Sequence, residues 1–493
     1  MANFIMAIDQ GTTGSTVMLV DQAGGLVAKA TTDFRQIFPR PGWVEHDPED
    51  IWNSVCKSIR DVLDKSRIPA RQISAIGITN QRETVLLWDR KTSQPIANAI
   101  VWQCRRTADF CEQQKKKGHA NWIRKQTGLV LDPYFSGSKI RWLLHNIAGA
   151  KAQAKAGHLA MGTIDTYLLW RLTGGAVHKT DVSNASRTML MNLQTCQWDP
   201  ELLQFFGVPD SLLPEICNSS GVFGHTQGSD LLPNGIPISG VAGDQQSALF
   251  GQACFAPGEL KCTFGTGSFI LLNTGEKIVR SKHRMLTTVA WRLPNKKPVY
   301  AIEGGAFVCG AAVQWLRDGL GLIQSSSEVE NLAAQVESSN GVEFVPALTG
   351  LGAPHWRSEA RGVITGLTRG TTKAHVARAT LEAMALQNCE IISAMQKDHG
   401  RKIKQIRVDG GATANNLLLQ LQTDFLGLRI ARPQMIETTA LGAAFLAGLG
   451  VGFWSSQDEL RKVGQVERVF APTLSTQKRK ERMLRWQDAV AKA

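Results

Sequence analysis

The stretch that decides the fold is IMAIDQGTTGSTVMLVD, Ile5 to Asp21. Its apolar ends predict two β-strands, and the small residues between them predict a tight turn. The glycines and hydroxyl side chains of this turn leave backbone N–H groups and short O–H donors uncovered. Phosphate oxygens bind to such donors, so we predict that the turn cradles phosphate groups.

Asp9 stands just before this turn, at the end of the first predicted strand. Mg²⁺ in proteins is held by one or two carboxylates together with water and phosphate oxygens. We therefore predict that Asp9 holds a Mg²⁺ ion that bridges the bound phosphates, which points to a metal–nucleotide ligand. The alternative is that the segment is only a hairpin loop.

A second stretch repeats this design half a chain later. Residues 260–264 predict a strand, Gly265 to Ser268 a turn, and residues 269–273 a returning strand. Two similar hairpins favour a duplicated fold whose halves face each other across a ligand. We place the boundary just before the second hairpin, which divides the chain into domains of residues 1–250 and 251–493.

The composition limits the class of protein. The 493-residue chain is long enough for two domains that each bury a core. Its apolar runs are short and the N-terminus lacks a basic region, so we expect no membrane span and no signal peptide. Nine cysteines without paired CxxC spacing favour reduced thiols in a cytoplasmic protein. The net charge of +13 is spread along the chain, apart from KRKER at residues 478–482, so we expect no nucleic-acid binding.

Three further apolar strands end in polar or glycine-rich clusters. Residues 72–79 end before Asn80, residues 236–241 before Gly243, and residues 403–408 before Asp409. In open α/β sheets, ligands bind where the carboxyl ends of strands meet loops, so we expect the three ends to share one cleft. Helical spacing predicts helices over residues 47–64, 132–146, 155–173 and 384–395. The alternation of strands and helices predicts an α/β fold.

The common nucleotide-binding motifs are missing. The chain contains no GxxxxGK[ST] and no HRD or DFG set, which argues against a P-loop or a protein-kinase fold. Phosphate contacts would come instead from the hydroxyls of Thr12, Thr13 and Thr266. Gly410 and Gly411 would let a nucleotide lie against the main chain.

Several side chains suit phosphoryl transfer, which needs a base that removes a proton from the attacking hydroxyl. Asp244, at a strand end, is a candidate for this base, and it is equally a candidate for the N-cap of a helix. Arg82 and Glu83 are a donor–acceptor pair that could bind a polyhydroxy substrate, and they could equally form a surface ion pair. Trp102 and Tyr134 suit the floor of a small pocket, although aromatic residues more often lie in a core.

At this point the chain resembles the FGGY carbohydrate kinases along nearly its full length. Both long signatures of that family are recognisable: YFSGSKIRWLLHN at Tyr134–Asn146 and GVITGLTRGTTKAHVARATLE at Gly362–Glu382. The segments NQRET (80–84), AIVWQCRRT (99–107) and AGDQQSALFGQ (242–252) are similar to those of members that phosphorylate glycerol. The resemblance implies two actin-like, ribonuclease-H-like domains around a central cleft, and transfer from ATP to glycerol that gives sn-glycerol 3-phosphate.

The resemblance also implies roles for individual residues. The hydroxyls of glycerol would be held by Arg82, Glu83, Tyr134, Asp244 and Gln245, with Asp244 as the general base. Its carbon backbone would lie against Trp102 and Phe269. The nucleotide would be bound by Thr12, Thr13, Gly14, Thr266, Gly310, Gln314, Gly411 and Asn415, with Asp9 as the Mg²⁺-associated carboxylate. The resemblance further implies a homodimer or a homotetramer.

One departure from the family pattern lies in the first turn. Residues 12–16 are TTGST where well-known relatives have TTSSR, so Gly14 and Thr16 replace a serine and an arginine. One phosphate-facing positive charge is missing, and we expect a different nucleotide affinity or rate.

Two other functions compete with this interpretation. A related kinase could act on another polyol or on a ketose, but the Arg82–Glu83 pair and the Trp102 segment favour glycerol. An actin-like binding protein without transfer chemistry would keep the nucleotide site alone, and Asp244 beside a polyol pocket argues against it.

Overall fold

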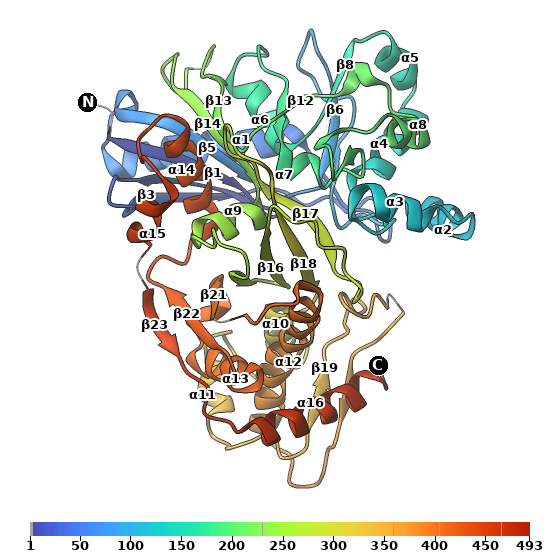
Figure 1. Cartoon of the computed structure of the whole chain (residues 1–493), viewed down its shortest axis with the longest axis vertical. Coiled ribbons are helices and arrows are strands. Elements are labelled where there is room, and N and C mark those ends of the chain that lie inside the picture. Colours follow the sequence, from blue (N-terminus) through green and yellow to red (C-terminus); the bar gives the residue numbers. More distant parts are fainter. Residues whose placement is uncertain (1–2, 229, 358, 404, 465) are drawn as a thin grey trace.

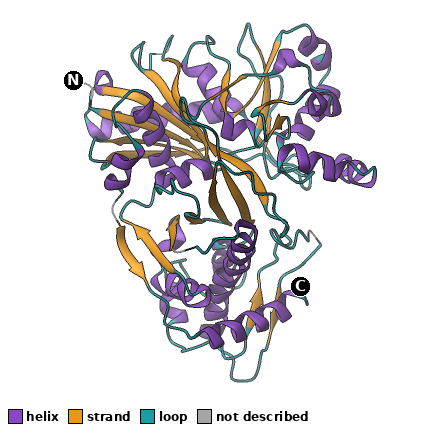
Figure 2. Ribbon diagram, in the orientation of Figure 1, coloured by secondary structure: helices purple, strands orange, loops and turns teal. Residues whose placement is uncertain are grey.

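The computed structural model describes residues 3–228, 230–357, 359–403, 405–464 and 466–493. These residues form an upper part, mostly blue to green in Figure 1, and a lower part, mostly yellow to red. Strands run through the centre of both parts, with helices on their outer faces (Figure 2). The predicted α/β class is therefore confirmed.

The sheet of the upper part contains the first predicted hairpin. Its strands are β1 (Phe4–Gln10), β2 (Gly14–Val20), β3 (Leu26–Asp33), β5 (Ile73–Asn80), β13 (Ser220–His225) and β14 (Pro237–Gly243), in the order β13-β14-β5-β1-β2-β3. β1, β2 and β3 form an antiparallel meander, and β5 and β14 run parallel to β1. The apolar side chains of residues 5–8, 17–20 and 75–78 are fully buried, as expected for central strands covered on both faces.

The sheet of the lower part repeats this topology. Its strands are β15 (Leu260–Phe264), β16 (Ser268–Gly275), β17 (Leu286–Trp291), β18 (Val299–Ala306), β21 (Gln405–Asp409), β22 (Arg429–Pro433) and β23 (Val466–Phe470), in the order β17-β18-β16-β15-β21-β22-β23. β15, β16 and β18 are an antiparallel meander, and β21 and β22 run parallel to β15. The predicted duplication is therefore confirmed. Lys404, within the third predicted strand, lies outside the described residues.

A helix from the second half of the chain packs on the upper sheet. In Figure 1, α14 (Thr438–Gly450), coloured red, lies beside the blue strands β1 and β5. A β-carbon on Gly77 of β5 would lie 2.2 Å from the carbonyl oxygen of Ala443, and one on Gly240 of β14 would lie 2.3 Å from the amide nitrogen of Ala447. Glycine at these two positions lets the helix approach the strands closely. Residues 438–450 thus complete the core of the upper part.

A smaller sheet beside the upper one corrects one predicted helix. It contains β4 (Glu45–His46), β6 (Val85–Asp89), β7 (Ala99–Ile100) and β8 (Leu159–Thr163). The single helix predicted over residues 155–173 is wrong, because Leu159–Thr163 pairs with β6 and a helix begins only at Ile164. Gly157, with a φ of 78°, turns the chain away from the preceding helix before this buried strand.

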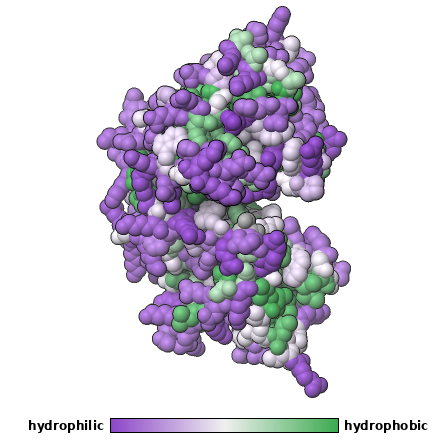
Figure 3. All heavy atoms as spheres, turned by 90° about the vertical axis from the view of Figure 1, so that its right-hand side faces the viewer, coloured by the Kyte–Doolittle hydropathy of each residue, from purple (hydrophilic) through white to green (hydrophobic). Residues whose placement is uncertain are grey.

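The remaining elements complete both parts. The helices are α1 (Pro48–Ser66), α2 (Ala108–Lys116), α3 (His119–Thr127), α4 (Ser136–Asn146), α5 (Ala150–Lys155), α6 (Ile164–Leu172), α7 (Val182–Ala185), α8 (Pro200–Phe206), α9 (Asp244–Gly251), α10 (Gly310–Asp318), α11 (Glu328–Ala333), α12 (Lys373–His399), α13 (Asn416–Leu426), α15 (Gln457–Val463) and α16 (Thr476–Val490). Short strands are β9 (Lys179–Asp181), β10 (Met191–Asn192), β11 (Gln197–Trp198), β12 (Glu215–Cys217), β19 (Glu343–Val345) and β20 (Val363–Thr365). Asp47 caps α1 by accepting a hydrogen bond from the Glu49 amide. None of the described helices combines the length and the apolar character that a membrane crossing requires. Seen from the side, the surface is hollowed between the upper and lower parts (Figure 3).

Candidate functional site

The carboxyl ends of three adjacent strands bring the first site residues together. In the upper sheet Gln10 of β1 pairs with Asn80 of β5, which pairs with Gly243 of β14. The residues around or just beyond these strand ends, Asp9, Arg82 and Asp244, therefore lie along one edge of the sheet. Of the three strand ends predicted to share a cleft, those of β5 and β14 lie side by side at one edge of the upper sheet, whereas β21 belongs to the lower sheet.

Five charged side chains form a connected ion-pair network at this edge. The Nε of Arg82 lies 3.0 Å from the Oδ1 of Asp244 and 3.9 Å from the Oε1 of Glu83. The two terminal nitrogens of Arg82 bind the carboxylate of Glu303 at 2.6 and 2.9 Å. Arg187 binds Glu83 at 2.6 Å and Glu303 at 3.0 Å. Asp244 is the most exposed member, with 30% of its side chain accessible, and so faces the open side of the network.

Burial and charge act in opposite directions on the network carboxylates. Burial alone would raise the pKa of Glu303, but the guanidinium groups of Arg187 and Arg82 lower it to about 2. For Glu83 burial prevails, and its pKa is raised although Arg187 and Arg82 oppose the shift. The network therefore holds fixed charges next to Asp244 and presents both donors and acceptors to a polar ligand.

Close packing at Gly243 brings Arg82 near Asp244. A β-carbon on Gly243 would lie 2.7 Å from both Cγ and Cδ of Arg82. Any larger residue before Asp244 would push the arginine away. Asp244 is the first residue of α9, and Gly243 takes the N-cap position, so the alternative reading of Asp244 as the N-cap is not what the structure contains.

Aromatic side chains lie next to this network. Trp102 and Tyr134 meet edge to face, with ring centroids 5.5 Å apart. The indole Nε1 of Trp102 donates a hydrogen bond of 3.0 Å to the hydroxyl of Thr12 in the first turn. Burial raises the pKa of Tyr134, so its hydroxyl stays protonated. These contacts bring the predicted pocket floor and the predicted phosphate turn into one site.

The first turn and Asp9 form an electronegative corner. The amide of Gly11 donates to the carbonyl of Gly14 at 2.9 Å, which closes the turn and leaves Thr12 and Thr13 at its tip. Burial, reinforced by the carboxylates of Asp244 and Glu437, raises the pKa of Asp9 to about 8. Within the described parts of the chain no side chain donates a hydrogen bond to the Asp9 carboxylate. A cation at this corner would relieve the repulsion among the three carboxylates.

The second turn is fastened to the start of α10. The amide of Gly310 donates to the carbonyl of Gly265 at 2.9 Å, and the amides of Cys309 and Ala311 donate to the carbonyl of Thr266 at 2.8 and 3.0 Å. A β-carbon on Gly310 would lie 2.7 Å from the Gly265 carbonyl oxygen, so glycine permits this approach. The side chain of Thr266 stays exposed at the tip of the turn.

The other predicted nucleotide residues lie on the lower part. Gly411 follows β21, whose last residue Asp409 pairs with Thr263 of β15, so Gly411 stands near the second turn. Asn415 caps α13 by accepting from the amide of Leu418 at 2.8 Å, and Gln314 is exposed on α10.

Phe269 follows the second turn, opposite Gly305 of β18. Among the described residues, no hydrogen bond or ring contact connects its side chain to the Arg82 network. The structure therefore places Phe269 in the lower sheet, on the strand that pairs with β18, which carries the network residue Glu303.

Sequence reasoning missed three buried charged residues of this site. Arg187 and Glu303 complete the network, and Lys261 of β15 donates hydrogen bonds to the side chains of Gln245 and, at 2.7 Å, Thr263. Each is less than 3% exposed. A charged residue within an apolar strand, as in VYAIEGGA and LKCTF, is the sequence signal that could have found Glu303 and Lys261, because an isolated buried charge is costly.

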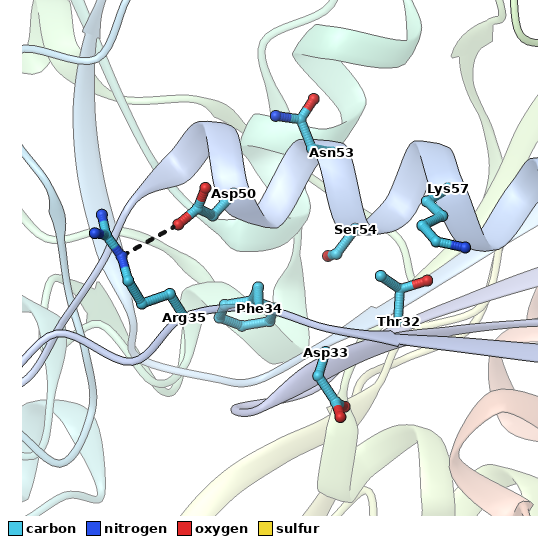
Figure 4. Close-up of a pocket in the computed structure, with 8 residues that line it drawn as sticks. All are labelled: Thr32, Asp33, Phe34, Arg35, Asp50, Asn53, Ser54 and Lys57. Carbon is cyan, nitrogen blue, oxygen red and sulfur yellow. Dashed lines mark ion pairs between the residues drawn. The ribbon is translucent and has the colours of Figure 1, made fainter.

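A surface pocket lies between the end of β3 and α1 (Figure 4), beside the first turn, because its lining residue Asp33 pairs with Gly14. Its lining includes Arg35, whose Nε faces a carboxylate oxygen of Asp50 at 3.7 Å. None of the predicted site residues lines it. The pocket is therefore not counted as part of the candidate site.

Comparison with known families assigns the chain. The descriptions of the N-terminal and C-terminal domains of the FGGY family of carbohydrate kinases match residues 4–251 and 260–451. This chain belongs to the FGGY carbohydrate kinases.

Individual FGGY kinases are similar over their whole length. The protein named glycerol kinase in Bdellovibrio bacteriovorus is 62% identical, over 99% of this chain and 99% of its own. Glycerol kinase 2 of Thermotoga maritima is 51% identical, over 99% of this chain and 98% of its own. The crystal structure of Plasmodium falciparum glycerol kinase with ADP superposes with a TM-score of 0.93 at 39% identity, covering 100% of this chain and 98% of that one.

Proposed function

We propose that this FGGY kinase transfers the γ-phosphoryl group of ATP to glycerol and releases sn-glycerol 3-phosphate and ADP. The observation that carries this proposal is the Asp244 carboxylate, paired with Arg82 and exposed at a sheet edge that also holds Glu83 and the first phosphate turn. The full-length similarity to proteins named glycerol kinase supports the choice of substrate.

Glycerol would bind to the network at its Asp244 side. Arg82 donates hydrogen bonds to the glycerol hydroxyls, and Glu83 accepts hydrogen bonds from them. Tyr134 and Gln245 complete the polar contacts. Trp102 lies against the carbon backbone, and Phe269 reaches it from the lower sheet when the two parts approach each other. A pocket built to hydrogen-bond each hydroxyl rejects analogues that lack one, because its buried polar groups would be left unpaired.

Asp244 would act as the general base. Arg82 holds its carboxylate in place, and the exposed side of the group accepts the proton of the attacking glycerol hydroxyl. A base of this kind contributes typically about 10²–10⁴-fold to the rate. The remaining acceleration comes from alignment of the hydroxyl with the γ-phosphate and from compensation of the phosphate charge.

The nucleotide would lie between the two turns. Thr12, Thr13 and Gly14 contact its phosphates from the upper part, and Thr266 contacts them from the lower part. Gly310, Gln314, Gly411 and Asn415 line the rest of the nucleotide site on the lower part. This division of contacts makes closure of the lower part onto the upper part a step of catalysis, and closure excludes the water that would hydrolyse ATP.

Asp9 would hold Mg²⁺ together with phosphate oxygens and water. The fit rests on the raised pKa of this carboxyl and on its position beside Asp244 and Glu437, since a divalent cation neutralises such a cluster. When bound, the ion offsets the charge of the phosphate oxygens during transfer.

The setting in the cell is part of the proposal. All nine cysteines are free thiols, as expected in a reducing compartment, and we assign the enzyme to the cytoplasm. We further propose a homodimer or a homotetramer, and no binding to nucleic acid.

A coupled assay of ADP release with a panel of polyols and ketoses tests the function. We expect activity with glycerol to exceed that with erythritol and xylulose by several orders of magnitude in kcat/KM. Preference for a longer polyol or a ketose would assign the chain to another FGGY activity. Binding of ATP without any accelerated transfer would indicate a nucleotide-binding protein that lacks chemistry.

A further inference from the structure

A buried lysine lies directly behind the proposed glycerol site. Lys139 belongs to α4, and its side chain is fully buried. Its Nζ donates a hydrogen bond of 2.6 Å to the carbonyl oxygen of Tyr134 and one of 3.2 Å to the carbonyl oxygen of Glu83. One side chain therefore fixes the main chain of two residues whose side chains face glycerol in the proposed function.

The main chain at Glu83 needs such support. Glu83 has a φ of 61°, in the left-handed region that residues with a β-carbon rarely adopt. The amide of Thr84 donates to the carbonyl of Arg82 at 2.7 Å, so Glu83 is the central residue of a tight three-residue turn. A strained conformation of this kind persists only where its surroundings hold it.

Two side chains of α4 hold this turn. The hydroxyl of Ser136 donates to the Glu83 carbonyl at 3.0 Å, next to the bond from Lys139. On the opposite side, the carboxylate of Glu83 is bound by Arg187 at 2.6 Å. Glu83 is thus fixed at its carbonyl and at its carboxylate, and neither end can shift without losing a buried hydrogen bond.

We propose that Lys139 is a positioning residue for the polyol substrate, which it serves by fixing the main chain of Glu83 and Tyr134. The inference rests on the proposed function, because it takes these two residues as glycerol ligands. Lys139 does not itself touch glycerol, since its amine lies behind the main chain that presents the ligands. Its loss should therefore weaken glycerol binding and leave nucleotide binding nearly unchanged.

The state of the amine agrees with this task. Burial lowers the pKa of Lys139 to about 7, although the Glu83 carboxylate opposes the shift. A neutral amine keeps two N–H donors, which is the number of carbonyl acceptors it meets here, and the ammonium has three. Both forms hold the two carbonyls, so the function needs the donors and not the charge.

The test removes the N–H donors of Lys139 and keeps a side chain of similar shape. In the full-length protein, Lys139→Met places an unbranched side chain of similar length at this position, so both hydrogen bonds are lost. We expect KM for glycerol to rise about 10- to 100-fold, because small displacements of substrate ligands have effects of this size. KM for ATP should change less than about twofold, since no nucleotide residue loses a contact.

Two further variants separate positioning from folding. Arg482→Met removes another buried cation, which binds Glu382 and Glu343 away from the proposed site. It should lower the melting temperature and leave KM for glycerol unchanged. Ser136→Ala removes the second donor to the Glu83 carbonyl and should raise KM for glycerol by a smaller factor. Because both donors act on one carbonyl, the double variant with Lys139→Met should deviate from the product of the single effects.

The outcomes are distinct. Equal changes in KM for glycerol and ATP, or a rise in Arg482→Met as large as in Lys139→Met, would overturn the positioning role. If Lys139→Met does not fold, an unchanged KM for glycerol in Ser136→Ala would likewise overturn the positioning role. A wild-type protein that fails to phosphorylate glycerol in this assay would refute the proposed function itself, whatever the variants do.

Discussion

The Oδ1 of Asp244 lies 3.0 Å from the Nε of Arg82 and accepts a hydrogen bond of 2.7 Å from the backbone amide of Gln245. Within the described residues no hydrogen bond reaches the other carboxylate oxygen, Oδ2. One oxygen of the carboxylate is thus engaged in holding the group in place. The other is free to accept a proton, which is the division that a general base needs.

Asp244→Asn tests this division. The amide keeps the shape of the side chain but cannot accept the proton, so kcat should fall by about 10²–10⁴-fold. KM for glycerol should change little, because Arg82, Glu83 and Tyr134 still bind the hydroxyls. Initial rates with varied glycerol provide both constants, and an unchanged kcat would remove Asp244 from the role of base.

Glu303→Gln tests the buried network. Glu303 is 2% exposed and is the partner of both Arg82 and Arg187, so its neutralisation leaves two buried cations short of an anion. Removing one partner of a buried pair costs about 3–5 kcal/mol, and we expect a decrease of this order in the free energy of unfolding. KM for glycerol should rise as well, because Arg82 loses the partner that fixes its orientation.

Urea unfolding of Glu303→Gln beside Glu467→Gln provides the comparison. Glu467 pairs with Arg432 at 2.8 Å but is 49% exposed, and exposed pairs contribute only about 0–1 kcal/mol. The pKa of Glu303 is lowered to about 2 from 4.5, so its contribution to stability is complete above the unfolded value and is lost as the pH falls toward about 2. Equal losses in the two variants would contradict the network.

Asp9 should couple nucleotide binding to proton release. Its folded-state pKa of about 8 lies above the ordinary 3.8, so the folded protein holds a proton that the unfolded chain has released between these values. Its contribution to stability is therefore present at low pH and is lost as the pH rises through about 8. Mg²⁺ needs the charged carboxylate, so binding of Mg²⁺ and ADP at neutral pH should release a proton and tighten as the pH rises. Calorimetry in buffers of different ionisation enthalpy measures this release, which Asp9→Asn should abolish.

Thr16→Arg, on the neighbouring strand, tests the pKa of Asp9 from the other side of the strand pair. Thr16 lies directly opposite Asp9 in the β1–β2 pair, and the β-carbons of such pairs are about 4.5–5.5 Å apart. An arginine there, as in the family pattern, would favour the charged carboxylate and lower the pKa of Asp9. Proton release should then shift to lower pH, and an unshifted profile would show that the two side chains do not interact.

The sequence predicted those parts of the site that local patterns determine. Both turns could be recognised from adjacent glycines and hydroxyls, and the meeting of Arg82 with Asp244 followed from two parallel strands that end at one sheet edge. The network partners could not be predicted in this way, because Arg82 and Glu303 are 221 residues apart and Glu83 and Arg187 are 104 apart. Such pairs depend on how the two halves of the chain pack against each other, and hydrophobic periodicity contains no information about that packing. The same holds for α14, whose place on the upper sheet depends on the close approach at Gly77.

The hydrogen bond from Trp102 to Thr12 joins the proposed glycerol wall to the first phosphate turn. Trp102→Phe keeps an aromatic ring against glycerol and removes the donor. A net hydrogen bond is worth about 0.5–1.5 kcal/mol, so KM for ATP should rise about two- to tenfold while KM for glycerol changes less. Trp198→Phe is the matched control, because the Trp198 indole donates at 2.8 Å to the carbonyl of Pro214, outside the proposed site.

A second test combines Trp102→Phe with Thr12→Val, which removes the same hydrogen bond from its other end. The two changes should then be less than additive in the free energy derived from kcat/KM for ATP, and strict additivity would show that the bond does not connect the two halves of the site.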